Sequence, residues 1–359
     1  MIYVLSVDWL SVFCIYAGSD GNLWMPVDTE EFSYKKEDFG TRCFSRFHRA
    51  RIKNAEGGWD EFAELQSVPY SAILPPYAII VRFVNRVLYM PNFWEVANRF
   101  LANNQIEIRG ISRIDICADF NQFACMDPKT LIESFAAKKL RHIGRGVGAL
   151  AFDHRVYNGE YGVNYTGLTF GNHSSDAHVY LYNKTFELDT QGDKPWIKLR
   201  WRRVGLDIRN VWRLEVSIKS SGLKFKDRKS KQVIEVNAPM IEEDGTLDKI
   251  YHTFVQKLFS FVRNREGIKN ITREPRIKLF DERPAYDRGS ICNLSPGNRT
   301  ERILIRQLWQ MGDTYRGAYI FEAKKTARDF AERIAASTGL WTWLEERKEE
   351  WDSENKIHK

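Results

Sequence analysis

The chain has 359 residues, of which 43% are hydrophobic and 13% are aromatic. This composition excludes an intrinsically disordered chain, because disordered chains carry far fewer apolar residues. The 54 Lys and Arg residues outnumber the 47 Asp and Glu residues and give a net charge of +7, which favours a polyanionic partner such as nucleic acid or a membrane surface.

Cysteine usage and hydropathy indicate the class of protein. The five cysteines are odd in number and form no CxxC pair, which argues against a disulfide framework or a zinc ribbon and favours reduced thiols. The apolar start MIYVLSVDWLSVFCIY lacks a basic n-region and contains Asp8, so it predicts a strand rather than a signal peptide. No run of roughly 18 apolar residues predicts a membrane span. We therefore expect a soluble, cytoplasmic protein.

Short β-type segments dominate the first two thirds of the chain. They are rich in β-branched or aromatic residues and are bounded by Gly, Pro, Asn or Asp. These segments are 2–16, 77–90, 106–120, 167–171, 179–187 and 211–219. Helical patterns at 92–104 and 127–140 interrupt them, and the second begins with Asp127 as a candidate N-cap and Pro128 at the first helical position.

The pattern changes from about residue 240 onward. The glycine-rich segment 141–166 predicts a loop or irregular hairpin, whereas 248–265 and 326–351 predict helices. We therefore predict an α+β fold in which residues 1–235 form a mainly antiparallel, curved β-sheet with flanking helices. Residues 236–359 are predicted to be mostly helical.

Three acidic residues lie inside predicted strands, where Asp and Glu are rare. RIDICADF places Asp115 and Asp119 on one strand face, and WRLEVSIK places Glu215 inside another strand. Carboxylates that converge on a sheet suit a hard divalent cation such as Mg²⁺ or Mn²⁺. Alternatively, each acid forms a structural ion pair with a nearby base: Arg113, Arg213 or Lys219.

The segment VYLYNKTFE places Tyr180, Tyr182 and Lys184 on one face of a predicted strand. A tyrosine hydroxyl has a pKa of about 10, so it needs a metal, a base or a nearby cation to attack phosphorus. A divalent ion can polarise the scissile phosphate, and Lys184 can offset charge in the transition state. These parts fit a metal-dependent DNA transesterase with Tyr182 as nucleophile; the alternative is a buried structural tyrosine.

Four segments, in chain order, resemble those of a known family. VDWLSVF, RIDICADF, YNKTFE and WRLEVSIK, over roughly residues 5–220, together resemble the Rep_trans (replication initiation factor) family of rolling-circle replication initiators and related relaxases. The resemblance implies that the protein nicks one strand at an origin and becomes linked to the 5′ phosphate through Tyr182. It also implies that Asp115, Asp119 and Glu215 hold the metal and that Lys184 acts beside the tyrosine.

Two positions depart from the family pattern. Tyr180 stands where the family often has an arginine, so we expect Arg213 to supply that charge, and Tyr180 is either a second nucleophile or a packing residue. Ser217 stands where some branches have a second glutamate. The His-hydrophobe-His motif of other rolling-circle nucleases is absent from the sequence.

Two basic clusters, KLRWRR (198–203) and KFKDRKSK (224–231), bracket the WRLEVSIK segment. Lys and Arg contacts with phosphates give salt-dependent affinity, and an interleaved tryptophan can stack on an unpaired base. The predicted DNA-binding residues are Lys198, Arg200, Trp201, Arg202, Arg203, Lys224 and Lys226. The alternative is a solvated charged face with a tryptophan packed beneath it.

The resemblance implies a catalytic nicking and strand-transfer domain in residues 1–235 that initiates rolling-circle DNA replication. Residues 236–359 would serve packing, homodimerisation or origin recognition. The expected partners are origin DNA, in a hairpin with a single-stranded nick site, and the host helicase and polymerase. Two alternatives are a relaxase that starts conjugative transfer and a non-catalytic, initiator-derived DNA-binding regulator.

Overall fold

The computed structural model describes residues 1–18, 23–71, 74–144, 148–157, 160–171, 175–226, 233–243, 245–265, 270–281, 304–309, 320–337, 340, 344, 345, 347, 348 and 351. The chain divides into two compact units, residues 1–292 and 293–359. Each unit is described by itself.

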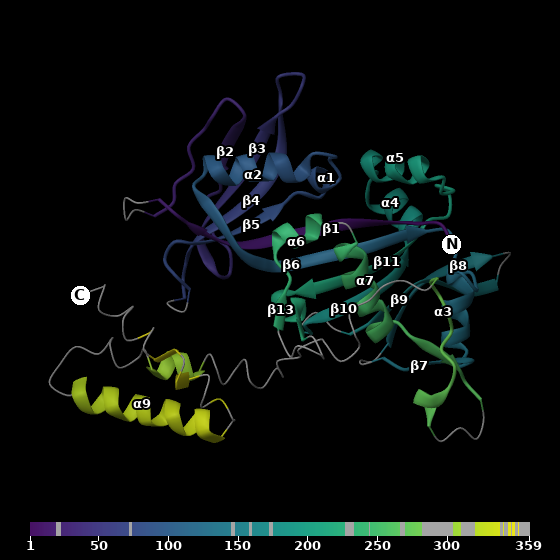
Figure 1. Cartoon of the computed structure of the whole chain (residues 1–359). Coiled ribbons are helices and arrows are strands. Elements are labelled where there is room, and N and C mark those ends of the chain that lie inside the picture. Colours follow the sequence, from purple (N-terminus) through teal and green to yellow (C-terminus); the bar gives the residue numbers. More distant parts are fainter. Residues whose placement is uncertain are drawn as a thin grey trace. The chain divides into compact units, whose positions relative to one another are not determined.

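The first unit is built on one antiparallel sheet of ten strands in the order β2-β3-β4-β5-β1-β6-β11-β10-β9-β8 (Figure 1). Its strands are β1 (Tyr3–Tyr16), β2 (Phe32–Lys36), β3 (Phe44–Lys53), β4 (Trp59–Pro69), β5 (Ala78–Phe83), β6 (Ile106–Phe120), β8 (Gly148–Tyr157), β9 (Glu160–Phe170), β10 (Ala177–Asn183) and β11 (Trp212–Lys219). The glycine-rich segment contains the β8–β9 hairpin. The predicted α+β class with a large antiparallel sheet is confirmed.

Helices and two small sheets surround this sheet. The helices are α1 (Asn85–Leu88), α2 (Phe93–Asn103), α3 (Pro128–Ala136), α4 (Lys184–Gln191), α5 (Pro195–Val204), α6 (Ala238–Glu242) and α7 (Thr246–Leu258). The small sheets pair β12 (Lys224–Lys226) with β13 (Val233–Glu235) and β14 (Phe261–Arg263) with β7 (Leu140–His142). Asp127 caps α3 by accepting hydrogen bonds from the backbone N–H groups of Lys129 and Thr130, as its sequence predicts.

The two faces of the central strands differ because side chains alternate along a strand. On β6, Ile114, Ile116 and Ala118 belong to the main hydrophobic core, whereas Asp115 and Asp119 lie on the opposite, polar face. Helix α7 packs on the apolar side: it contacts β6, β10 and β11, and Tyr251 Oη donates a hydrogen bond to the carbonyl of Leu214 (3.0 Å). The polar face therefore presents the acids predicted as site residues, and the apolar face packs in the core against α7.

Helix α7 changes the expected division of the chain. The sequence places the boundary after residue 235, but the first compact unit continues to residue 292. The physical reason is that α7 buries Ile250, Tyr251 and Phe254 in the core of the large sheet. A helix that covers a sheet belongs to the same unit as the sheet.

The described part of the second unit is mostly helical. It contains a helical segment at 304–309 and α9 (Ile320–Ser337). Its own hydrophobic cluster consists of Ile305, Trp309, Ala331, Ala335, Leu340, Leu344 and Trp351. In the described parts of both units, no helix is long and apolar enough to cross a membrane.

Candidate active site

Strand register brings the candidate residues into two adjacent rows on the polar face. Arg213 of β11 lies opposite Asp119 of β6 and opposite Tyr182 of β10. In the next row, Glu215 lies opposite Cys117 on one side and Tyr180 on the other. The strands β6, β11 and β10 are therefore the scaffold of the candidate site.

The centre of the site is the hydroxyl of Tyr182. It donates a hydrogen bond to Glu215 Oε2 (2.9 Å), and Lys184 Nζ lies 3.4 Å from the same hydroxyl oxygen. Lys184 is 2% exposed and also forms an ion pair with Glu187. A phenol thus lies between a carboxylate that can accept its proton and an ammonium that can stabilise its anion.

Lys184 lies at the start of a helix and not in the predicted strand. The sequence predicts a strand through residue 187, whereas β10 ends at Asn183 and α4 begins at Lys184. The side chain of Asn183 accepts a hydrogen bond from the backbone N–H of Phe186 (2.8 Å) and so caps the helix. The strand prediction is therefore wrong after residue 183, although Lys184 does lie beside Tyr182.

Burial and charge shift the pKa values of this group. Burial, and then the carboxylates of Asp8 and Asp115, together raise the pKa of Glu215 to about 7 against the opposing charge of Arg213. Burial, and then the charge of Glu215, hold the pKa of Tyr182 well above its usual value. Glu215 therefore titrates near neutral pH, where a general base is most useful, and Tyr182 keeps its proton until a partner takes it.

Arg213 does not face the surface. It is fully buried, and its guanidinium donates to Asp119 through Nε (2.6 Å) and Nη2 (2.8 Å) and to Asp8 through Nη1 (2.6 Å). Arg213 Nη2 also lies 3.2 Å from the Tyr89 hydroxyl. The prediction that Arg213 neutralises substrate phosphate is therefore wrong, because its donors are engaged by carboxylates inside the protein.

Asp8 joins this network although its sequence context predicts only a strand position. It lies at a bulge of β1, between Val7 and Trp9, where the pairing with β6 shifts register. Its Oδ1 accepts hydrogen bonds from Asn85 (3.0 Å) and Tyr89 (2.9 Å) in addition to Arg213. Burial alone would raise the pKa of Asp8, but the charges of Arg213 and Lys184 hold it well below its usual value. Asp8 is an acid inside the apolar VDWLSVF strand. An acid inside a strand is the feature that made Asp115 a candidate, so it could also have identified Asp8.

The three predicted metal ligands do not form one group. Asp119 is bound by Arg213 and by Trp201 Nε1 (2.7 Å), while Asp115 is chelated by Arg113 through Nε (2.9 Å) and Nη2 (2.6 Å). Among the described residues, no cluster of three or more His, Cys, Asp or Glu side chains is arranged to hold a metal ion. For Asp115 and Asp119, the alternative prediction of structural ion pairs matches the structure.

The first basic cluster, KLRWRR, forms most of helix α5. Trp201 is fully buried and bonded to Asp119, so it cannot stack on a base. Lys198 pairs with Asp189 and Asp193, and Arg200 Nη2 donates to the carbonyl of Leu5 (2.9 Å). Of the predicted DNA-binding residues in this cluster, Arg202 and Arg203 are the exposed ones. Trp201 is packed beneath the helix, as the alternative prediction has it.

The second basic cluster lies only partly within the described residues. Lys224 begins β12 and pairs with Glu235 across the small sheet (3.0 Å). Lys226 ends β12, but its side chain and residues 227–231 fall outside what the structure describes.

Small side chains lie beside Tyr182 on the polar face. Tyr182 is opposite Gly167 of β9, and Gly167 is opposite the exposed Ala151 of β8. A Cβ at Gly167 would lie 2.9 Å from the carbonyl oxygen of Leu181, closer than real Cβ atoms approach. Glycine therefore permits the close approach of β9 to β10 next to the tyrosine.

Comparisons with known proteins show a likeness in structure. No protein-family model and no curated protein match the sequence. Among solved structures, the chain is similar to a rolling circle replication initiator protein from Geobacillus stearothermophilus, with 15% identity, a TM-score of 0.44, and coverage of 77% of this chain and 93% of that chain. At this identity, the residues of the site themselves are the basis for assigning a function.

Proposed function

We propose that this protein is a tyrosine-dependent DNA strand transferase that nicks one strand at an origin to initiate rolling-circle replication. The observation that carries the proposal is the placement of the Tyr182 hydroxyl between Glu215 and Lys184. The ordered segments that resemble replication initiation factors support the choice of DNA as substrate.

The proposed step is a transesterification at phosphorus. Tyr182 Oη attacks the scissile phosphate as its proton passes to Glu215, which accepts its hydrogen bond at 2.9 Å. The new bond joins Oη to phosphorus, the bond to the 3′ oxygen breaks, and that oxygen takes a proton from solvent. The ammonium of Lys184 stabilises the negative charge as it develops. The reverse attack by a 3′ hydroxyl rejoins the strand.

A divalent cation remains a proposal. Mg²⁺ or Mn²⁺ would polarise the phosphate and stabilise the leaving oxygen. As they are placed, Asp119 and Asp115 are bound by arginines and do not present a ligand set with Glu215, so the steps above use residues of the chain alone. A site including Asp115 would require the 39% exposed Arg113 to release it.

The proposal also implies partners. The free 3′ hydroxyl would prime a host polymerase, and a host helicase would unwind the nicked duplex. Exposed Arg202 and Arg203 on α5 would contact DNA phosphates near the site.

The test is to incubate the protein with supercoiled DNA carrying the origin and Mn²⁺, followed by denaturing electrophoresis and mapping of any DNA-linked peptide. We expect an adduct on the peptide containing residues 179–187 that is lost in Tyr182→Phe and kept in the matched control Tyr180→Phe. Tight origin binding with no adduct would instead identify a non-catalytic DNA-binding protein. An adduct that persists in Tyr182→Phe would move the nucleophile elsewhere.

A further inference from the structure

Three short segments that are far apart in the sequence meet beside the large sheet. Strand β7 pairs with β14, with Arg141 opposite Val262, and Val262 also bridges to Arg276. The backbone N–H of Asn264 donates to the carbonyl of Lys139 (2.8 Å), and the side chain of Asn264 donates to the carbonyl of Lys138 (2.7 Å). These contacts hold residues 138–142, 261–265 and 273–278 together.

The three segments carry a concentration of positive charge, which we call the β7–β14 basic surface. Its members are exposed Lys and Arg side chains: Lys138, Lys139, Arg141, Arg263, Arg265, Arg273, Arg276 and Lys278. Within the same segments, Glu274 is the one acidic residue. For Arg141, Arg263 and Arg265, no ion pair is found among the described residues, in contrast to Lys198 of α5, which pairs with two aspartates.

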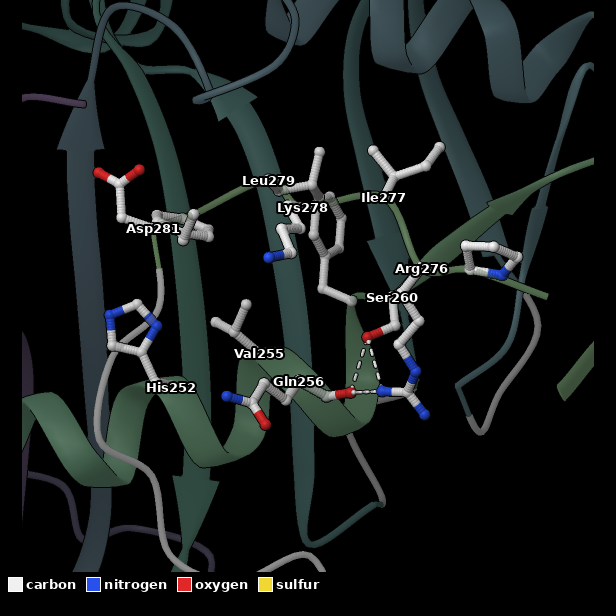
Figure 2. Close-up of a pocket in the computed structure, with 12 residues that line it drawn as sticks. His252, Val255, Gln256, Ser260, Arg276, Ile277, Lys278, Leu279 and Asp281 are labelled. Atoms are coloured by element: carbon white, nitrogen blue, oxygen red, sulfur yellow. Dashed lines mark hydrogen bonds between the residues drawn. The ribbon is translucent and has the colours of Figure 1, made fainter. Parts of the chain in front are cut away.

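Two adjacent hollows open along this surface. One, of about 660 Å³, is lined by Lys139, Arg263, Arg265, Arg276 and Lys278, with Glu274 the single acid in its wall. The other, of about 550 Å³, lies between α7 and residues 275–281, and both hollows share residues 275–278. Figure 2 shows Arg276 at the second hollow, where its guanidinium donates to the carbonyl of Gln256 (3.2 Å).

This surface is separate from the Tyr182 site. Phe261 of β14 packs on Phe170 of β9 and on Phe135 of α3, with ring centroids 5.6 and 5.9 Å apart. Phe170 belongs to the main core on the apolar side of the sheet, whereas Tyr182 and Glu215 lie on the polar side. The basic surface therefore lies on the α7 side of the sheet, away from the candidate active site.

We propose that the β7–β14 basic surface binds the phosphate backbone of duplex DNA outside the nick site, a proposal that rests on the proposed function for its choice of partner. Exposed cations bind polyanions through release of counterions, and Arg141, Arg263 and Arg265 are exposed with no ion pair among the described residues. Single-strand sites add exposed aromatic rings on which bases stack, but the exposed large hydrophobic side chains among the described residues include none in these three segments. Phosphate contacts without stacking fit a duplex.

The test uses the full chain and a labelled duplex, with affinity measured by fluorescence anisotropy between about 50 and 200 mM salt. We expect Arg263→Gln/Arg265→Gln to weaken binding about tenfold and to reduce the slope of log K against log salt by about 2, since each lost phosphate contact removes about 0.9. The matched control is Arg42→Gln/Lys53→Gln, which removes two exposed cations elsewhere and should leave the slope unchanged.

Other outcomes overturn the proposal. An unchanged slope in the Arg263/Arg265 variant, or an equal loss in the control, would remove this surface from DNA binding. Tighter binding to anionic lipid vesicles than to duplex would identify a membrane surface as partner. Nicking of a single-stranded oligonucleotide should stay at the wild-type level in the Arg263/Arg265 variant. If the wild-type protein does not nick, the proposed function is wrong, but the comparison of duplex binding still tests this surface.

Discussion

At the scale of single residues, three acids that lie inside strands have two different roles. Asp119 is the buried counter-ion of Arg213, Asp115 is the counter-ion of Arg113, and Glu215 is the hydrogen-bond acceptor of the Tyr182 hydroxyl. Asp119 lies directly opposite Arg213 across the sheet, whereas Asp115 pairs with Arg113, two residues earlier on the same strand. Only Glu215 has its pKa raised to about 7 by burial and by neighbouring carboxylates.

The raised pKa of Glu215 predicts a pH-dependent stability. In the folded protein Glu215 keeps its proton up to about pH 7, whereas in the unfolded chain it loses the proton near its usual pKa of 4.5. The free energy of unfolding therefore falls as pH rises between these values, by about 3 kcal/mol when the loss is complete above pH 7. Glu215→Gln should match wild type near the lower value and exceed it above pH 7, measured by urea unfolding. A constant difference across this range would refute the raised pKa.

Asp119→Asn should be destabilising as well as inactivating. It leaves the fully buried Arg213 without its bidentate carboxylate, and breaking such a pair costs about 3 to 5 kcal/mol. The measurement is the midpoint of urea unfolding. The control is Asp207→Asn, whose partner Arg209 is exposed (86%) and whose loss should cost far less stability, because solvent screens an exposed pair. Equal effects in the two variants would show that burial does not decide the cost.

Removal of divalent metal ions tests whether Tyr182 needs a metal ion to lose its proton. Burial and the Glu215 carboxylate hold the pKa of Tyr182 well above its usual value, and a divalent cation near these groups would lower it. We expect EDTA to stop nicking and Mn²⁺ to restore it, followed by gel electrophoresis of supercoiled DNA. Nicking at an unchanged rate in EDTA would show that Glu215 and Lys184 activate Tyr182 without a metal ion.

At the scale of elements, the junction between β10 and α4 positions the site. Asn183 ends the strand, caps the helix through the N–H of Phe186, and so directs Lys184 toward the Tyr182 hydroxyl. A strand continuing through Lys184, as the alternation of VYLYNKTFE suggests, would have brought the lysine to the same face by a different geometry. The helix is favoured over a continued strand because the Asn183 side chain accepts a hydrogen bond from a backbone N–H in the first turn, which has no partner within the helix.

Asn183→Ala should therefore affect both stability and chemistry. Losing the cap costs about 1 kcal/mol, and we expect slower nicking because Lys184 loses its fixed position. Asp127→Ala is the matched control: it removes a cap of the same type from α3, so it should cost similar stability without slowing nicking. Unfolding midpoints and single-turnover nicking rates are the two measurements. Equal slowing in both variants would make the effect a general loss of stability.

At the scale of the whole molecule, the hydrophobic clusters divide with the two compact units. The main core and its satellite draw on residues up to Phe280, while the C-terminal cluster draws on residues 305–351. We expect a chain ending at residue 292 to keep its cooperative unfolding and its near-ultraviolet circular dichroism, because its core loses no member. A chain ending at residue 235 should not fold, because it loses α7. Cooperative unfolding of the shorter chain would show that α7 is dispensable.

The sequence by itself determined the α+β class, the strands with alternating faces, the Asp127 cap, and the candidate residues Tyr182, Lys184 and Glu215. These features depend on local periodicity and on residue types that are rare in strands, and both are visible along the chain. The sequence could not decide which acid pairs with which arginine. For Asp115 and Asp119 it left a metal site and an ion pair equally open.

Tertiary structure alone decided the rest. Burial of Trp201 and Arg213, the role of Asp8, and the place of α7 in the first unit depend on partners that are tens to hundreds of residues away. The β7–β14 basic surface is the clearest case, because no single one of its segments forms a long basic run. Charge becomes concentrated there only when β7, β14 and residues 273–278 pair, since electrostatic potential depends on distance in space and not on distance along the chain.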